Sequence, residues 1–101
     1  MGQSPPKWSF LTNHAQVLLC IADDPDARLR EIGETIGITE RATHRIVVEL
    51  VEAGYITRER NGRRNRYTID AERRLHDPVT REQRIGDLLG VLRSKRAGVT
   101  G

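Results

Sequence analysis

The chain has 101 residues, 37% of them hydrophobic and 31% charged, which is enough for one small domain and too little for separate catalytic and regulatory domains. Its net charge of +3 is unevenly divided: residues 1–54 carry five basic and eight acidic side chains, whereas residues 55–101 carry twelve and six. Because phosphate attraction depends on where positive charge lies, we expect the C-terminal half to meet a polyanion, with nucleic acid as the first candidate.

The residue content disfavours several other classes of protein. A single cysteine, Cys20, excludes an internal disulfide, and no group of Cys and His has the spacing of a zinc site. The aspartates between residues 23 and 26 lack the central Gly and closing Glu of a calcium loop, which favours a solvated turn. The longest apolar run, residues 17–22, is too short to cross a bilayer, and residues 1–6 do not resemble a secretory signal. We therefore expect a cytoplasmic protein with no metal, no cofactor and no membrane contact.

An irregular arm is expected over residues 1–10, followed by a helix. The arm contains Gly, Ser and Pro, with Trp8 and Phe10 as apolar anchors. Thr12 is a suitable N-cap for a helix that runs to residue 22 and ends at the aspartate-rich turn. The inward-facing stripe of this helix is predicted to contain Leu11, Ala15, Leu18 and Ala22.

The next segment predicts a second helix and a tight turn. After a short strand over residues 27–29, a helix is expected over residues 30–36. Gly33 lies inside this helix at a cost of about 1 kcal/mol relative to Ala, which suggests that another helix passes close by. Gly37 suits the left-handed residue that ends a helix.

A third helix is predicted from the N-cap Thr39 to residue 53. Two helices joined by so short a turn form a helix-turn-helix. The buried stripe of the third helix is predicted to be Thr43, Ile46, Val47 and Leu50. Its opposite face carries Arg41, His44, Arg45 and Val48.

A β-hairpin is predicted around Asn61-Gly62, with strands over residues 55–60 and 63–69. A two-residue turn at this dipeptide gives a register that pairs Arg60 with Arg63, Arg58 with Asn65, and Ile56 with Tyr67. The residues that face the helices are then Ile56, Tyr67 and Ile69.

The C-terminal part is expected to hold a linker, a helix and a tail. The linker, residues 70–79, is polar and is broken by Pro78. Thr80 and Gln83 form a predicted capping box for an amphipathic helix over residues 80–93. Its apolar stripe is Ile85, Leu88, Leu89 and Leu92. Residues 94–101 are basic and are expected to be disordered.

This order of elements resembles the winged helix-turn-helix domain of MarR-like and ArsR-like transcription regulators, over residues 11–69. The most specific stretch is LREIGETIGITERATHRIVVELVEAGYITRERNGRRNRYTI, residues 29–69, which contains the turn, the exit from the third helix and the wing. The thiol and His clusters of ArsR-like metal sensors are absent from it, and the chain has little length for the ligand pocket of many MarR-like proteins. The expected fold is mainly α with a small β-hairpin (α+β), a winged helix-turn-helix over residues 11–69 with an added C-terminal helix.

The resemblance implies that the third helix enters the major groove of DNA, where each base pair presents a distinct hydrogen-bonding pattern. The candidate residues on this helix are Thr39, Arg41, His44 and Arg45. The wing carries five arginines against one acid, and their mutual repulsion is explained if phosphates or a minor groove receive them. The candidate wing residues are Arg58, Arg60, Asn61, Gly62, Arg63, Arg64 and Arg66. Without DNA, the same charges would form a solvated helix face and a protected sheet edge.

A homodimer is expected because the first helix is apolar nearly all round. The helix over residues 80–93, from the same or a second chain, is the candidate to cover its second face. The candidate interface residues are Val17, Cys20, Ile21, Ile85, Leu88, Leu89 and Leu92. Cys20 is interpreted as a small buried hydrophobe in preference to a redox sensor.

The leading hypothesis is a sequence-specific regulator of transcription that binds double-stranded DNA, located in the cytoplasm on the nucleoid. The alternatives are a winged-helix protein-interaction module and a non-specific architectural DNA binder. An enzyme is not expected, because His14, Cys20, His44 and His76 are scattered and form no recognisable catalytic arrangement.

Overall fold

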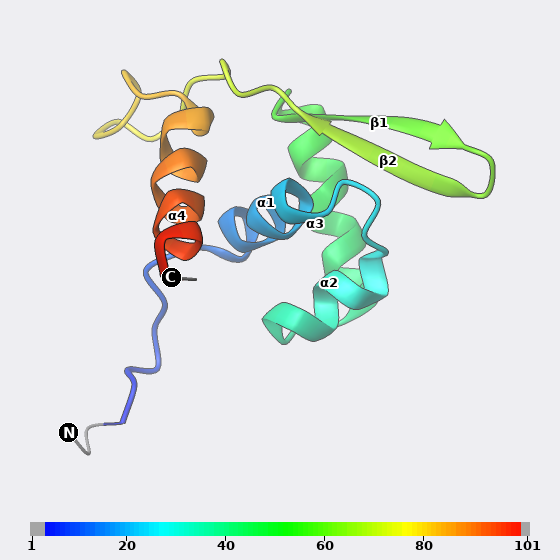
Figure 1. The fold of residues 1–101 in the computed structure, drawn as a ribbon, viewed down its shortest axis with the longest axis horizontal. Helices are drawn as coiled ribbons and strands as arrows, with labels where there is room; N and C mark the ends of the chain where they lie inside the picture. The colour runs from blue at the N-terminus through cyan, green and yellow to red at the C-terminus, as the bar shows by residue number, and fades with distance from the viewer. Residues whose placement is uncertain (1–3, 100–101) are drawn as a thin grey trace.

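The structure is a computed structural model that describes residues 4–99, and the side chains of residues 4–93. Its elements are, in chain order, α1 (Asn13–Asp23), α2 (Leu29–Ile36), α3 (Glu40–Glu52), β1 (Ile56–Asn61), β2 (Arg64–Ile69) and α4 (Ile85–Val99). The antiparallel hairpin projects from the three-helix unit, and α4 lies on the other side of α1 (Figure 1). This is the predicted winged helix with an added C-terminal helix.

Local capping fixes the ends of the first three helices. The Thr12 hydroxyl accepts a hydrogen bond from the Ala15 N–H (3.1 Å), and the Thr39 hydroxyl accepts one from the Ala42 N–H (3.0 Å). Gly37 ends α2 in the left-handed conformation, with a φ of 83°. Both predicted N-caps and the predicted C-terminal Gly are confirmed.

The close approach expected at Gly33 is confirmed. A Cβ atom at this position would lie 2.8 Å from the Ile38 carbonyl oxygen and 2.9 Å from the Thr43 hydroxyl. Thr43 is fully buried on α3, and its hydroxyl donates to the Thr39 carbonyl oxygen (2.9 Å). Glycine therefore lets α2 and the start of α3 pack at backbone contact distance.

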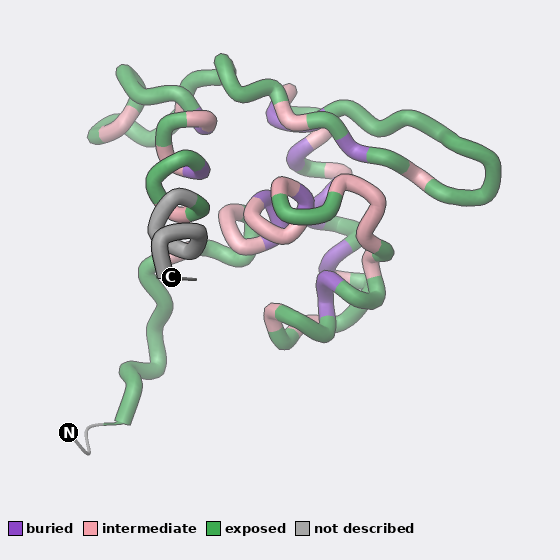
Figure 2. Tube along the Cα trace, in the orientation of Figure 1, coloured by how far each residue is buried: buried purple, intermediate pink, exposed green. Residues whose placement is uncertain are grey.

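One core joins all the elements (Figure 2). The α3 stripe is buried as predicted, and Ile56 and Tyr67 close the base of the hairpin. On α1 the predicted stripe is wrong in part: Val17, Leu18 and Ile21 are buried, whereas Leu11, Ala15 and Ala22 are only half-buried. The buried face is rotated because Ile85 and Leu89 of α4 join the same core.

The short strand expected over residues 27–29 is wrong. Leu29 already belongs to α2, and the two residues before it have no regular structure. One backbone hydrogen bond, from the Tyr67 N–H to the Pro25 carbonyl oxygen (3.1 Å), joins this loop to β2. A single bond of this kind is too little to make a sheet strand.

The predicted hairpin register is also wrong. Ile56 pairs with Ile69, Arg58 with Tyr67, and Asn61 with Arg64, so the two turn residues are Gly62 and Arg63. Gly62 has a φ of 66°, and a glycine at the first central position is typical of a type II′ turn. The predicted inward face is nevertheless retained, because this shift moves the pairing by an even number of residues.

The segment over residues 70–84 is not a simple linker. The Tyr55 hydroxyl donates to the Arg74 carbonyl oxygen (2.8 Å), and the Leu75 N–H donates to the Gln83 carbonyl oxygen (2.9 Å). Further backbone bonds join Ile85 to Arg73 and Gly86 to Ala71. These contacts fasten the segment to Tyr55, which lies between α3 and β1, and to the start of α4.

The start and end of the last helix differ from the prediction. α4 begins at Ile85, where the preceding N–H of Arg84 donates to the Asp87 carboxylate (3.1 Å). The capping box predicted at Thr80 is wrong, and the Thr80 hydroxyl oxygen is buried without a hydrogen-bond partner. The prediction of a disordered tail from residue 94 is wrong for residues 94–99, because α4 continues to Val99. Residues 100–101 of that predicted tail lie outside the described part of the chain.

Candidate nucleic-acid interface

The exposed face of α3 presents the side chains predicted to contact bases. Arg41, His44 and Arg45 are all exposed, on the side of the helix opposite its buried stripe. Together with Thr39 and Ala42 they line a shallow depression at the start of the helix. The structure therefore brings the four predicted residues of this helix together on one surface.

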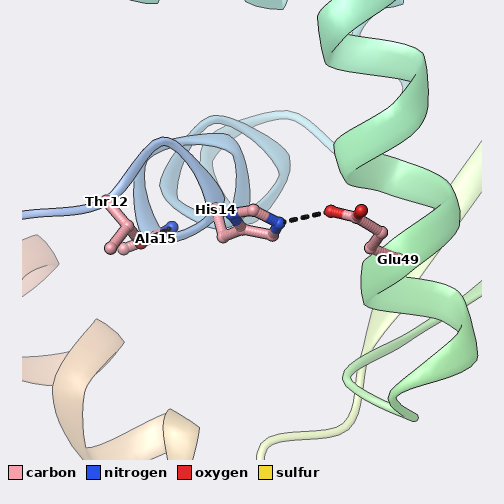
Figure 3. Close-up of polar contacts among 4 residues, drawn as sticks. All are labelled: Thr12, His14, Ala15 and Glu49. Carbon is pink, nitrogen blue, oxygen red and sulfur yellow. Dashed lines mark hydrogen bonds and ion pairs between the residues drawn. The ribbon is translucent and has the colours of Figure 1, made fainter.

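A contact that the sequence did not predict joins α1 to this helix. His14 Nε2 lies 2.7 Å from Glu49 Oε1, and both side chains are about half exposed (Figure 3). Glu49 lies one helical turn after Arg45 on α3, and its carboxylate is the group that His14 contacts. No local signal relates two residues that are 35 positions apart.

The wing, defined as residues 56–69, is exposed over most of its length. The pairing register places Arg58 and Arg60 on the same face as Tyr67, and Arg64 and Arg66 on the other face. Arg63 occupies the turn itself. The sequence predicts that all five arginines of the wing bind DNA, whereas the pairing register places them on two faces and at the tip.

Ion pairing separates the arginines further. In the part of the chain whose side chains are described, four arginines each pair with a carboxylate: Arg66 with Asp26 (2.8 Å), Arg74 with Glu82 (3.8 Å), Arg84 with Glu72 (2.9 Å) and Arg93 with Asp23 (3.4 Å). Others have no such partner among residues 4–93. Those that lie on α3 and the wing are called the interface arginines: Arg41, Arg45, Arg58, Arg60, Arg63 and Arg64.

The contrast has an electrostatic consequence. Unpaired guanidiniums on exposed surfaces repel one another, and a polyanion would relieve that repulsion. Arg66 differs from its neighbours on the wing because Asp26 already neutralises it.

Sequence reasoning missed two further arginines, Arg28 and Arg30, at the start of α2. They line an open hollow of about 400 Å³ between this helix, the start of α3 and the wing. Arg63 and Arg64 also line it, together with two carboxylates, those of Glu40 and of Asp26, which is paired with Arg66. Only the fold brings these two pairs of arginines together, since more than 30 residues separate them in the sequence.

The candidate dimer residues fall into two groups. Four of them belong to the core of the single chain: Val17, Ile21, Ile85 and Leu89. The others, Cys20, Leu88 and Leu92, are half-buried. Of the two possibilities left open for covering α1, the structure has α4 of the same chain, with Arg93 paired to Asp23. Val91 on the outer side of α4 is 68% exposed.

Two other features are absent from the described residues, a metal site and a membrane-spanning helix. No group of three or more His, Cys, Asp or Glu side chains there is arranged to hold a metal ion. None of the helices in that part of the chain is long and apolar enough to cross a membrane.

Comparison with known proteins agrees with the geometry. The model of the MarR family matches residues 9–66, which is more than half of the chain and includes the three helices and most of the wing. No curated protein gives a significant match.

Proposed function

Since this chain belongs to the MarR family of winged-helix transcription regulators, which bind DNA and typically form dimers, we propose that it binds a specific duplex sequence as a homodimer. The observation that carries this proposal is the distribution of the interface arginines. They lie without carboxylate partners on α3 and the wing, and the equally unpaired Arg28 and Arg30 border the wing. Away from this surface Arg74, Arg84 and Arg93 are paired, while Arg73 and Arg81 have no carboxylate partner among residues 4–93.

In this proposal α3 is the recognition helix. Arg41 and Arg45 donate paired hydrogen bonds to guanine O6 and N7, and His44 contacts a base edge or a phosphate. The interface arginines of the wing contact the DNA backbone or a narrow minor groove, where negative potential is strongest. The hollow beside Arg28 and Arg30 fits a phosphate of the strand that passes between α2 and the wing.

The proposed dimer uses the outer side of α4. Among the side chains of α4 that the structure describes, Leu88, Val91 and Leu92 are apolar and partly or largely exposed. Two-fold symmetry would place two recognition helices about 34 Å apart, on half-sites separated by one turn of DNA. The operator is then expected to be a pseudo-palindrome.

The first experiment is selection of bound duplexes from a random library over a series of salt concentrations. We expect enrichment of a two-fold symmetric motif and a steep loss of affinity with salt. The double reversal Arg63→Glu plus Arg64→Glu is expected to abolish binding. A matched control, Arg74→Glu plus Arg81→Glu, changes the net charge equally away from the proposed interface and is expected to retain binding.

Other outcomes would select the alternatives. Tight binding without sequence enrichment would identify an architectural DNA binder. Absence of binding at low salt would contradict the DNA proposal and favour a protein-interaction module with the same fold.

A further inference from the structure

The wing touches the loop between α1 and α2 at two adjacent points. Arg66 Nη1 lies 2.8 Å from Asp26 Oδ2, and the next residue, Tyr67, donates its N–H to the Pro25 carbonyl oxygen at 3.1 Å. We call this pair of contacts the wing anchor. Each partner of the ion pair is a little under half exposed.

The loop side of the wing anchor is itself ordered. Asp24 ends α1, and its carboxylate accepts a hydrogen bond from the Asp26 N–H (3.0 Å). The backbone carbonyl oxygen of Asp24 accepts a second hydrogen bond, from the Ala27 N–H (3.0 Å). Since α2 begins at Leu29, the anchored loop leads directly into the helix-turn-helix.

The wing side needs such a contact. An isolated two-stranded hairpin is marginally stable in water, and the core holds this one at its base, through Ile56, Tyr67 and the half-buried Ile69. The remaining residues of β1, which include Arg58 and Arg60, are all exposed. The direction of the projecting strands therefore depends on contacts made along β2.

We propose that Asp26 and Arg66 are positioning residues for DNA recognition, and that Arg66 is not a phosphate contact. The wing anchor sets the direction of the wing relative to α3, so that Arg63 and Arg64 at the tip of the wing meet the same duplex as the recognition helix. This inference rests on the proposed function, and it removes Arg66 from the DNA-contacting set expected from the sequence.

The two possible roles of Arg66 predict opposite effects of Asp26. If Arg66 bound a phosphate, Asp26 would compete for it and repel DNA, so Asp26→Asn would raise the affinity. If the ion pair positions the wing, the same change lowers the affinity. In the Asp26→Asn background, Arg66→Gln would then lower the affinity little further, because the ion pair is already lost.

The test is a double-mutant cycle with Asp26→Asn and Arg66→Gln, with affinity for the selected duplex measured over a salt series. We expect each single change to weaken binding by about twofold to fivefold, the range of an exposed ion pair, with the salt slope unchanged. The matched control is Arg64→Gln, on the same face of the wing but unpaired, which is expected to reduce the salt slope by about 0.9 for each phosphate that is no longer neutralised. Higher affinity of Asp26→Asn, or an equal cost of Arg66→Gln in both backgrounds, would overturn the proposal.

A second measurement needs no DNA. Hydrogen exchange of the Tyr67 amide is expected to be faster in Asp26→Asn than in the unmodified protein, while the unfolding temperature changes by no more than a few degrees. An unchanged exchange rate would contradict the anchoring role. If the unmodified chain failed to bind any duplex, the proposed function would fall while this measurement still decided whether the wing is anchored.

Discussion

At the scale of single residues, contact between α2 and α3 depends on the absence of a side chain at Gly33. The nearest atoms around a Cβ there are the Ile38 carbonyl oxygen and the buried Thr43 hydroxyl, both closer than 3.0 Å, so a side chain would force one of them to shift. Gly90 is the contrasting case, because a Cβ at this exposed position of α4 would meet no atom within 4 Å.

We predict that Gly33→Val lowers the free energy of unfolding by about 1–3 kcal/mol, the usual cost of overpacking. Gly90→Ala is predicted to raise it by about 0.5–1 kcal/mol, because alanine favours the helix and meets no obstacle. Chemical denaturation of both variants measures the two effects. Equal stabilities would show that α2 and α3 do not approach as closely as described.

At the scale of elements, the sequence of the hairpin determines which face is buried but not how its two strands pair. Asn61-Gly62 and Gly62-Arg63 are both acceptable two-residue turns, of type I′ and type II′ respectively. Their registers place the same residues inward, so the periodicity predicted the buried face correctly without fixing the pairing.

The turn can be tested by comparing its two neighbours. Gly62→Ala is predicted to destabilise the hairpin by about 1 kcal/mol, because a φ of 66° is unfavourable for an L-residue, while Asn61→Ala has little effect. The observable is hydrogen exchange of the strand amides in the two variants. A larger effect at Asn61 would support the register expected from the sequence.

Helices α1 to α3 and the candidate base-reading residues were predictable because caps and apolar spacing are local signals. The ion pair between Arg66 and Asp26 joins residues 40 positions apart and leaves no local pattern. The start of α4 was misplaced because Arg74 forms a β-bridge with Arg84, and the helix begins only after this bridge, at Ile85, instead of at Thr80. Tertiary contacts decided each of these points.

At the scale of the whole molecule, the outer side of α4 is expected to decide the oligomeric state. Val91→Glu is predicted to convert the proposed dimer to a monomer and to weaken binding to a two-fold symmetric duplex. The matched control is Val79→Glu, because Val79 is 94% exposed but lies outside α4. Analytical ultracentrifugation measures the change, and dissociation by both variants would contradict a specific interface.

The salt dependence of binding is also a property of the whole surface. Each phosphate contact contributes a slope of about −0.9 in a plot of log affinity against log salt. Changing Arg63 and Arg64 together to Gln is therefore predicted to reduce the slope by about 1.8 for each chain bound. A slope that did not change would place these guanidiniums away from the DNA backbone.

The packing of α4 limits how this protein can be divided into parts. Ile85 and Leu89 belong to the same core as the winged helix, and Gly86 lies against Ala71 at a distance that excludes a side chain. A fusion that grafts the DNA-binding unit onto another domain must therefore keep the chain at least through Leu89. A junction placed at residue 70, where the sequence suggests a linker, would remove a wall of the core and leave Ile21 exposed to water.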